Sequence, residues 1–270
     1  MKKRWILLLL TAALILWLLW ANRAIEVNEW TVSSDRIPAN FDGFRIAQVS
    51  DLHNASFGED NEKLLTLLEE CDPDIIVLTG DLVDSRNTDL SAALRFAAEA
   101  VQIAPCYYVS GNHESRIRQW PRLRQGLLDA DVTVLEDTGV RLARDGEQIL
   151  LFGLQDPAFG GDVVGSLDRL GEEEGYKILL SHRPEFFGGY AKAEADLVFS
   201  GHAHGGQFRL PFVGGLVAPG QGLFPEYDSG LYRSGNTAML VSRGLGNSII
   251  PLRINNRPEI LVAVLSRPEG

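Results

Sequence analysis

The chain has 270 residues, of which 45% are hydrophobic, and it carries a formal net charge of −11. This apolar fraction is ordinary for a globular protein, and the length favours one soluble domain behind an N-terminal anchor, because single α/β domains run to about 250 residues. The negative charge argues against nucleic acid, or another polyanion, bound by general electrostatic attraction. A local positive site on metal ions could still bind phosphate.

Residues 1–24 are predicted to form an N-terminal signal anchor that crosses a membrane once. Basic residues at positions 2–4 precede an uninterrupted apolar run from Trp5 to Ala21, which as a helix would span roughly 25 Å of a hydrocarbon core about 30 Å thick. A cleavable signal peptide is the alternative, but bulky Leu19-Trp20 before Asn22-Arg23 makes a poor cleavage site. The leading positive charges favour a cytoplasmic N-terminus and an extracytoplasmic domain, although Arg23 on the far side weakens that bias.

Residues 25–42 are predicted as a tether leading into a first strand, and residues 43–270 as the domain itself. The first half of this domain alternates apolar runs with helical patterns, which predicts parallel βαβ units. Strands are expected at Phe44–Val49, Ile75–Leu78 and Cys106–Val109, and helices at Asn61–Cys71, Ser91–Val101 and Pro121–Leu128. In such sheets, ligands gather at the carboxyl ends of the strands.

The second half of the domain has a different pattern. Asp145-Gly146 between two apolar runs is a hairpin signal, and the segment from Gly205 to Gly235 is rich in Gly and Pro and predicted to be irregular. Strands are expected at Val140–Ala143, Gln148–Phe152, Ile178–Leu180, Leu197–Phe199, Met239–Val241 and Ile260–Leu265. The absence of a linker predicts that the two halves are two sheets of one domain.

Two cysteines, Cys71 and Cys106, each flank a predicted buried strand. Two cysteines without a Cys-x-x-Cys pair do not make a disulfide framework. Buried free thiols are therefore expected, in preference to a bridge or a metal role.

All five histidines lie in short polar clusters at the ends of apolar runs. With Gly80-Asp81, the clusters are Asp51-Leu52-His53, Gly111-Asn112-His113-Glu114, Ser181-His182 and Gly201-His202-Ala203-His204. Imidazole, carboxylate and carboxamide are ligands of first-row metals, so this arrangement predicts a metal site. Seven candidate donors are too many for one tetrahedral ion and fit two ions that share a carboxylate; they are Asp51, His53, Asp81, Asn112, His182, His202 and His204.

The order of these clusters resembles the motifs of the calcineurin-like metallophosphoesterases. The matching series runs from about Arg45 to His204 as Asp51-x-His53, Gly80-Asp81-x-x-Asp84, Gly111-Asn112-His113-Glu114, His182 and Gly201-His202-x-His204. Residues 50–53, 201–206 and 242–246 further resemble a bacterial membrane-associated branch, which includes phosphodiesterases and a UDP-2,3-diacylglucosamine hydrolase. The resemblance implies an α/β fold, a four-layer sandwich of two mixed β-sheets flanked by helices.

The resemblance also implies a role for each residue. Asp51, His53 and His204 would hold one divalent ion, Asn112, His182 and His202 the other, and Asp81 would bridge them. His113 would be the general acid, and Asp84 would orient and charge it by accepting a hydrogen bond from its ring. The ions would be manganese, zinc or iron, since mixed oxygen and nitrogen ligands suit all three. Ser85 stands where the phosphoprotein phosphatases carry an arginine, and Arg86 comes next, which argues against that branch.

The activity implied by the resemblance is hydrolysis of a phosphodiester or pyrophosphate by a hydroxide that bridges the metals. The anchor favours a lipid-linked or envelope substrate. UDP-2,3-diacylglucosamine is one alternative, but UDP-sugars are made in the cytoplasm, which conflicts with an outward-facing domain. A non-catalytic metal-binding scaffold is the alternative from another class, and such proteins lose ligands or the acid histidine, all of which are present here.

Substrate-binding residues are harder to identify from the sequence. Arg209 and Arg243 are candidate phosphate or headgroup contacts, although an ordinary surface position is the default for an arginine. Phe186-Phe187, and Phe208 with Phe212, could line an acyl groove near the membrane, although core packing is the default for aromatic side chains.

Overall fold

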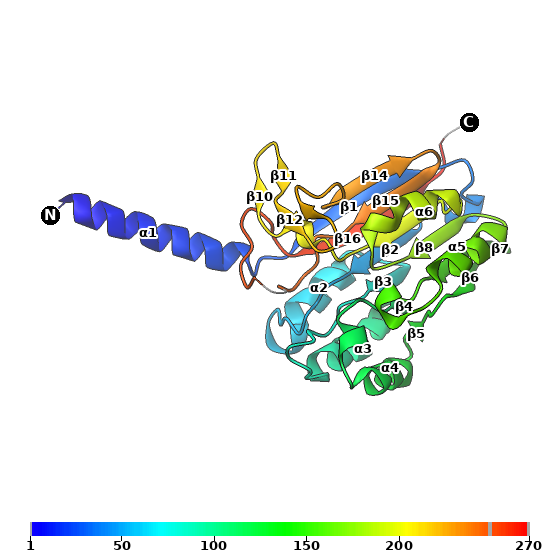
Figure 1. The fold of residues 1–270 in the computed structure, drawn as a ribbon, viewed down its shortest axis with the longest axis horizontal. Helices are drawn as coiled ribbons and strands as arrows, with labels where there is room; N and C mark the ends of the chain where they lie inside the picture. Colours follow the sequence, from blue (N-terminus) through cyan, green and yellow to red (C-terminus); the bar gives the residue numbers. More distant parts are fainter. Residues whose placement is uncertain (1, 248–249, 269–270) are drawn as a thin grey trace.

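A computed structural model describes residues 2–247 and 250–268 of the chain. The first helix, α1 (Lys2–Ala21), projects away from the body (Figure 1). From Lys3 to Ala21 it is long and apolar enough to cross a membrane, a property that signal sequences share. Most of its side chains are exposed, because the helix does not pack on the body.

The first sheet has six strands in the order β1-β16-β2-β3-β4-β5. The strands are β1 (Glu26–Ser33), β2 (Arg45–Val49), β3 (Ile75–Thr79), β4 (Cys106–Val109), β5 (Thr133–Val134) and β16 (Glu259–Ser266). Strands β2 to β5 are parallel, and β16 runs antiparallel to β2 but parallel to β1. The sheet is therefore mixed, with the predicted βαβ units at its centre.

The second sheet also has six strands, in the order β14-β15-β9-β8-β7-β6. They are β6 (Thr138–Arg144), β7 (Glu147–Gly153), β8 (Lys177–Leu180), β9 (Leu197–Ser200), β14 (Gly230–Ser234) and β15 (Thr237–Val241). The central strands are parallel, and β6 and β14 are antiparallel to their neighbours. The hairpin predicted around Asp145-Gly146 is the connection between β6 and β7.

Helices cover the outer face of each sheet. Helices α2 (Glu62–Glu70), α3 (Ser91–Ile103) and α4 (Trp120–Asp129) pack on the first sheet, and α5 (Val163–Glu172) and α6 (Phe187–Lys192) on the second. Single 3₁₀ turns occur at Ala39–Phe41, Glu59–Asn61, Glu114–Arg116, Pro157–Phe159, Pro184–Phe186 and His204–Gly206.

Three apolar clusters separate four layers of structure. The middle cluster lies between the two sheets and includes Val77 and Val109 from the first sheet and Ile178 and Phe199 from the second. The outer clusters fill the space between each sheet and its helices. The predicted four-layer sandwich of two mixed sheets is confirmed.

The segment between Gly205 and Gly235, predicted to be irregular, contains ordered structure. Two tight hairpins, β10 (Arg209–Leu210) with β11 (Gly214–Gly215) and β12 (Val217–Ala218) with β13 (Gly222–Leu223), precede β14. Gly214 and Gly222 have φ values of 92° and 74°, a conformation that glycine adopts readily. The strands have two residues each, too few to produce a recognisable alternating pattern.

Residues 25–42 supply β1, and Ile37 and Phe41 are fully buried in the middle cluster. Cys71 and Cys106 are buried free thiols, as expected.

Candidate metal centre

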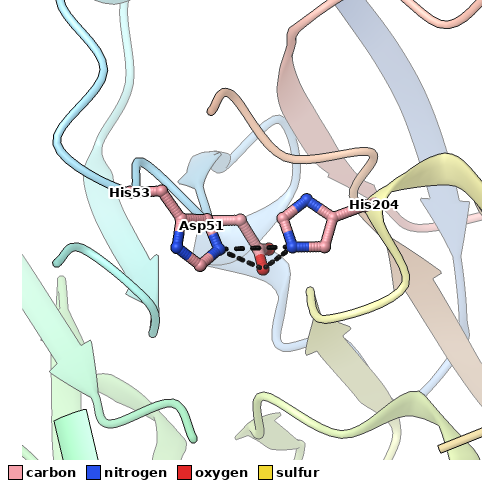
Figure 2. Close-up of side chains that lie close together, drawn as sticks. All are labelled: Asp51, His53 and His204. Carbon is pink, nitrogen blue, oxygen red and sulfur yellow. Dashed lines mark hydrogen bonds and ion pairs between the residues drawn. The ribbon is translucent and has the colours of Figure 1, made fainter. Parts of the chain in front are cut away.

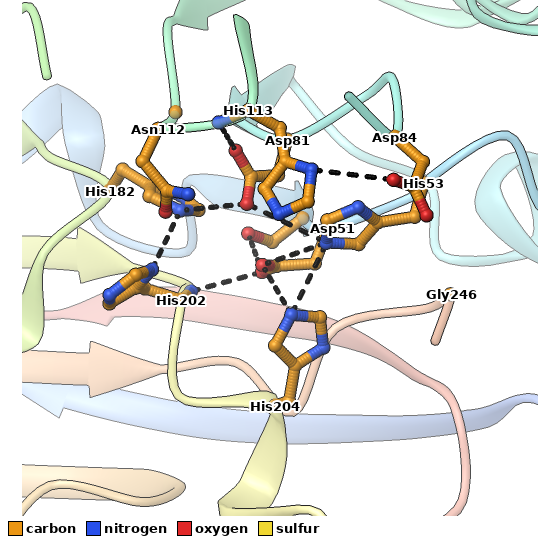
Figure 3. Close-up of polar contacts among 12 residues, drawn as sticks. Asp51, His53, Asp81, Asp84, Asn112, His113, His182, His202, His204 and Gly246 are labelled. Atoms are coloured by element: carbon orange, nitrogen blue, oxygen red, sulfur yellow. Dashed lines mark hydrogen bonds and ion pairs between the residues drawn. The ribbon is translucent and has the colours of Figure 1, made fainter. Parts of the chain in front are cut away.

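The polar clusters meet at one edge of the sandwich because five parallel strands end there. The loops after β2, β3 and β4 approach from the first sheet, and those after β8 and β9 from the second (Figure 3). The side chains that these loops bring together are Asp51, His53, Asp81, Asn112, His113, His182, His202 and His204, and each is at least nine-tenths buried. The residues predicted as ligands from their positions at strand ends thus lie together in one cluster.

One group of possible ligands consists of Asp51, His53 and His204 (Figure 2). The Nε2 atoms of the two histidines are 3.2 Å apart, and Asp51 Oδ1 lies 3.8 Å from the first and 3.4 Å from the second. The other oxygen, Oδ2, accepts hydrogen bonds from the Ser50 hydroxyl and the His202 backbone N–H. The carboxylate is therefore held by Oδ2 and presents Oδ1 to both imidazoles.

The second group consists of Asp81, His182 and His202. His182 Nε2 lies 3.2 Å from Asp81 Oδ2 and 3.1 Å from His202 Nδ1. On the far side of its ring, His182 Nδ1 is 2.7 Å from the Thr79 carbonyl oxygen. That carbonyl can only accept, so the ring carries a proton on Nδ1, and Nε2 is the nitrogen left for a ligand.

Asp81 joins the two groups. Its Oδ1 accepts from the His113 backbone N–H at 2.8 Å, whereas Oδ2 lies 3.6 Å from His53 Nε2 and 3.2 Å from His182 Nε2. A single oxygen thus faces one imidazole from each group. This is the arrangement that a carboxylate shared by two ions requires.

Unpartnered buried atoms show that the donor set fits metal ions. Asp51 Oδ1 and Asn112 Oδ1 are both buried and find no hydrogen-bond partner in residues 2–247 and 250–268. Leaving such atoms unpaired costs about 1–3 kcal/mol each. Figure 3 shows the Asn112 side chain directed into the cluster. The two groups, with the Asp81 carboxylate between them, therefore suit two metal ions.

Burial and mutual attraction set the protonation of the centre. Burial lowers the pKa of His53 to about 4 and holds those of His202 and His204 well below their usual value. Burial also opposes the imidazolium form of His182, but the Asp81 carboxylate outweighs it and raises that pKa to about 10. Three of the four proposed histidine ligands are thus neutral, the form in which imidazole binds a metal.

Backbone conformation also marks these residues. Asp51, His53, Asp81, His202 and His204 have φ values of 52°, 45°, 52°, 66° and 48°. Residues other than glycine rarely adopt this left-handed conformation, and strained residues of this kind cost of order 1–3 kcal/mol each and concentrate at functional sites. The fold maintains five such residues in one cluster.

Two glycines leave space for the side chain of Asp51. A Cβ atom at Gly201 would collide with Ser50 Oγ and Asp51 Oδ2, and one at Gly244, where φ is 69°, would lie 2.7 Å from Asp51 Cβ. Gly244 belongs to the 242–246 motif, whose Leu245 backbone N–H donates to the Ser50 carbonyl at 3.0 Å. This motif therefore packs against the loop that carries Asp51 and stabilises it.

His113 lies at the edge of the centre beside Asp84. The Ser85 backbone N–H donates to His113 Nδ1 at 3.0 Å, and Asp84 Oδ1 is 3.6 Å from the same nitrogen. The expected direct hydrogen bond from the His113 ring to Asp84 is therefore replaced by a longer contact, because Arg86 donates to both oxygens of that carboxylate. Since a backbone N–H can only donate, the neutral imidazole carries its proton on Nε2.

Glu114 has a structural function beside the centre. It is fully buried, and its Oε2 accepts from the backbone N–H groups of Gly111 and Asp81 at 2.8 and 2.9 Å. Its Oε1 accepts from Val83 at 3.3 Å. The carboxylate thus ties the loop after β3 to the loop after β4, each of which carries a proposed ligand.

A cavity of about 220 Å³ opens beside the cluster. Two arginines line it: Arg116, which forms no ion pair with any residue in the described ranges, and Arg183, whose guanidinium is held by Asp156. The two arginines predicted from sequence do not line it. Arg209 pairs with Asp228, and Arg243 pairs with Glu26 and Glu259. For Arg183, the sequence offered one signal of a place beside the cavity, because this residue directly follows the predicted ligand His182.

Comparison with known proteins gives a family match and relatives that align with most of this chain. The model of the calcineurin-like phosphoesterase family matches residues 44–206. The uncharacterized metallophosphoesterase YkuE of Bacillus subtilis is 34% identical over 249 residues, which cover 89% of this chain and 85% of YkuE. The phosphodiesterase YaeI of Escherichia coli is 29% identical and covers 82% of each chain. A zebrafish (Danio rerio) transmembrane protein with a metallophosphoesterase domain is 28% identical, over 96% of this chain and 62% of its own.

Solved structures agree on the fold. The Thermus thermophilus sulfate thiohydrolase SoxB superposes with a TM-score of 0.52 at 14% identity, over 85% of this chain and 57% of its own. The Thermus thermophilus protein TT1561 superposes with a TM-score of 0.51 at 16% identity, over 75% of this chain and 90% of its own. At these identities the likeness shows the shared two-sheet architecture.

Proposed function

The chain belongs to the calcineurin-like phosphoesterase family, and from that premise we propose that it hydrolyses phosphodiester or pyrophosphate bonds with two divalent metal ions. One observation carries the proposal: Asp81 Oδ2 lies within 3.6 Å of His53 Nε2 and 3.2 Å of His182 Nε2, between two groups of buried donors. Membership of the family supports a phosphoric ester hydrolase. The bond type is our inference from the phosphodiesterase named among the relatives.

The proposed ligand sets follow the two groups. Asp51, His53 and His204 would hold one ion, Asn112, His182 and His202 the other, and Asp81 would bridge them. When bound, two divalent ions would supply a nucleophile from water near neutral pH and neutralise charge on the phosphoryl group. Manganese, zinc and iron all suit this donor set.

His113 is the proposed general acid. The Ser85 N–H occupies Nδ1, so the transferable proton of the neutral ring is on Nε2. In Figure 3 this nitrogen lies on the side of the ring that faces the cluster. Protonation of the leaving-group oxygen by a placed imidazole contributes about 10²–10⁴-fold to the rate. Asp84, 3.6 Å from Nδ1, would stabilise the charged ring electrostatically.

Arg116 is the proposed substrate contact at the cavity mouth. It is exposed, it lines the cavity, and its guanidinium remains available to a phosphate oxygen. Arg183 would contribute positive charge from a fixed position, because its Nε and Nη2 atoms both donate to the Asp156 carboxylate.

The proposed substrate is a lipid-linked or envelope phosphodiester, and the single-pass anchor α1 would hold the chain at the membrane with its domain outside the cytoplasm. UDP-2,3-diacylglucosamine is a further candidate that requires the opposite orientation. A reporter fused to the C-terminus separates the two: activity restricted to the cytoplasm contradicts an outward domain.

The test of the activity uses the full chain in detergent, loaded with manganese or zinc, and a chromogenic phosphodiester. The metal-loaded chain should turn over, and His113→Ala should lower kcat by about 10²–10⁴-fold without changing the metal content. Gln125→Ala, at an exposed position on α4, serves as the control and should keep full activity. No turnover by the loaded chain, together with no effect of His113→Ala, contradicts the proposal and favours a non-catalytic scaffold.

A further inference from the structure

Large apolar side chains are exposed in the two short hairpins between β9 and β14. Phe212 is fully exposed, and Val213, Leu223 and Phe224 are 57%, 74% and 64% exposed. Ile250 and Ile254, in the loop before β16, are exposed as well, and the other exposed large apolar residues of the described body lie singly on β1, α4, α5 and the turn before α6. Contiguous exposed apolar surface is uncommon on soluble proteins and marks an interaction site. We call the group formed by Leu210, Phe212, Val213, Leu223, Phe224, Ile250 and Ile254 the apolar rim.

Hydrogen bonds join the parts of the apolar rim. The Leu216 backbone N–H donates to the Phe208 carbonyl, and the Leu216 carbonyl accepts from Phe224, both at 2.9 Å, so the two hairpins are linked at their bases. The Arg209 N–H donates to the Ile254 carbonyl at 3.0 Å. The rim is therefore a single surface assembled from two separate stretches of chain.

The apolar rim lies beside the point where α1 joins the body. The Asn22 side chain, directly after α1, donates to the Arg253 carbonyl at 2.9 Å and accepts from the Arg253 N–H at 2.7 Å. Ile254 is the next residue. Figure 1 shows β10, β11 and β12 at the same end of the body as the base of α1. A bilayer crossed by α1 would thus begin next to the rim.

The charge of this region suits a lipid surface. Between residues 205 and 224, Arg209 is the one charged residue of the sequence, and Asp228 neutralises it at 3.1 Å. The remainder of the chain carries the acidic excess that gives a net charge of −11. The rim is therefore an uncharged apolar surface on an acidic protein, and phenylalanine and leucine are residues that enter the interfacial layer of a membrane.

The hairpin formed by β12 and β13 contributes to both the apolar rim and the cavity. Pro219 and Gly220, between β12 and β13, line the cavity beside the metal centre, and Leu223 and Phe224, a few residues further along the chain, belong to the rim. Seating the rim in a membrane would therefore set the cavity at the depth of the headgroups.

We propose that the apolar rim docks into the interfacial layer of the bilayer that α1 enters, and that the docked domain takes phosphates of membrane lipids. The occupant is a lipid bilayer, because the rim is continuous with the base of a helix suited to span one. The part of this proposal that concerns lipid phosphates rests on the proposed phosphoesterase function. The docking itself depends only on the rim.

Fluorescence quenching tests the docking in the full chain. Val213→Cys and Leu223→Cys, each labelled with a polarity-sensitive dye, are reconstituted in nanodiscs that contain lipids with nitroxides on their acyl chains. Val164→Cys is the matched control, since Val164 is 69% exposed on α5, at the end of the body away from α1 in Figure 1. The native thiols Cys71 and Cys106 are buried and do not compete for the label.

The labels at 213 and 223 should be quenched several-fold more strongly than the label at 164. Equal quenching at all three positions overturns the docking. Shielding that increases with protein concentration and occurs without lipid also overturns it, because a second copy of the chain would then be the occupant.

Activity tests the consequence for lipid phosphates. The double variant Phe212→Ser/Phe224→Ser should hydrolyse a soluble chromogenic diester at the parental rate but a phospholipid diester in nanodiscs about tenfold more slowly, since α1 retains the chain at the membrane and part of the docking contribution is lost. Equal rates on the nanodisc substrate overturn the role of the rim in substrate access. If the parent hydrolyses neither substrate, the phosphoesterase function and the lipid-phosphate part fail, whereas the quenching result still decides the docking.

Discussion

Replacing Glu114 with alanine tests how the loops that carry the proposed ligands are held together. The parent carboxylate is fully buried and accepts from the N–H groups of Gly111, Asp81 and Val83. Each buried N–H left without an acceptor costs about 1–3 kcal/mol, and the two bonds under 3 Å dominate. The variant should therefore lose about 2–6 kcal/mol of unfolding free energy, a large part of the 5–15 kcal/mol typical of a domain.

The assay is equilibrium urea unfolding of the metal-free full chain in detergent, followed by intrinsic fluorescence. Glu114→Gln is the matched control, because its amide oxygen can still accept the two short bonds. It should lose about 1–2 kcal/mol, since its NH₂ group then faces the Val83 N–H. A midpoint for Glu114→Ala that matches the parent at an unchanged slope would refute the view that this carboxylate joins the two loops.

Three further predictions concern the centre and its surroundings. The Gly201→Ala variant should lose at least one bound ion, as measured by elemental analysis, because the added Cβ displaces Asp51. The Gly188→Ala variant, whose added Cβ has no neighbouring atom within 4 Å, should keep the metal content of the parent. Arg116→Ala should lower kcat/KM for a phosphodiester by about 10–100-fold through the loss of a charge-assisted contact, and exposed Arg118→Ala, from the same loop, should not; equal values contradict the assignment. Burial raises the pKa of the Cys106 thiol to about 12, so at mildly alkaline pH its thiolate is about a thousandfold rarer than that of an ordinary thiol. A thiol reagent should therefore react with Cys106 only after unfolding, and rapid reaction in the folded chain would contradict this burial.

The sequence was sufficient for the framework of the fold because the relevant signals are local. Continuous apolar runs predicted the buried strands, and the polar residue after each run was placed at the carboxyl end of a parallel strand. Asp51, Asp81 and Asn112 therefore converge as predicted, although they are about 30 residues apart along the chain. The rule required no knowledge of contacts between distant residues.

Other features depend on contacts that a local pattern does not encode. Arg243 follows a strand end, as the ligands do, but Glu26 and Glu259 from β1 and β16 take its guanidinium. Arg209 is taken in the same way by Asp228. Acidic residues elsewhere in the chain determine which arginine side chains are already paired. The sequence alone therefore did not distinguish Arg116 from other surface arginines.

The backbone of the centre is a further feature that sequence reasoning missed. Histidine is enriched among the non-glycine residues with positive φ, but such residues remain uncommon, so the sequence alone does not indicate a left-handed conformation at His53 or His204. The conformation is imposed by the turn that must follow directly from a buried strand and direct an imidazole inward. The two-residue strands of the β10–β13 hairpins were missed for a related reason, because they are set by glycine turns rather than by alternation.

The number of metal ions bound per chain tests the central assignment most directly. The full chain, loaded with manganese and passed through a desalting column, should retain two ions by elemental analysis. The Asp81→Asn variant should retain fewer than one, because the oxygen that faces both His53 and His182 is lost as a charged ligand. Two ions in the variant, or a single ion in the parent, would contradict a dinuclear centre bridged by Asp81.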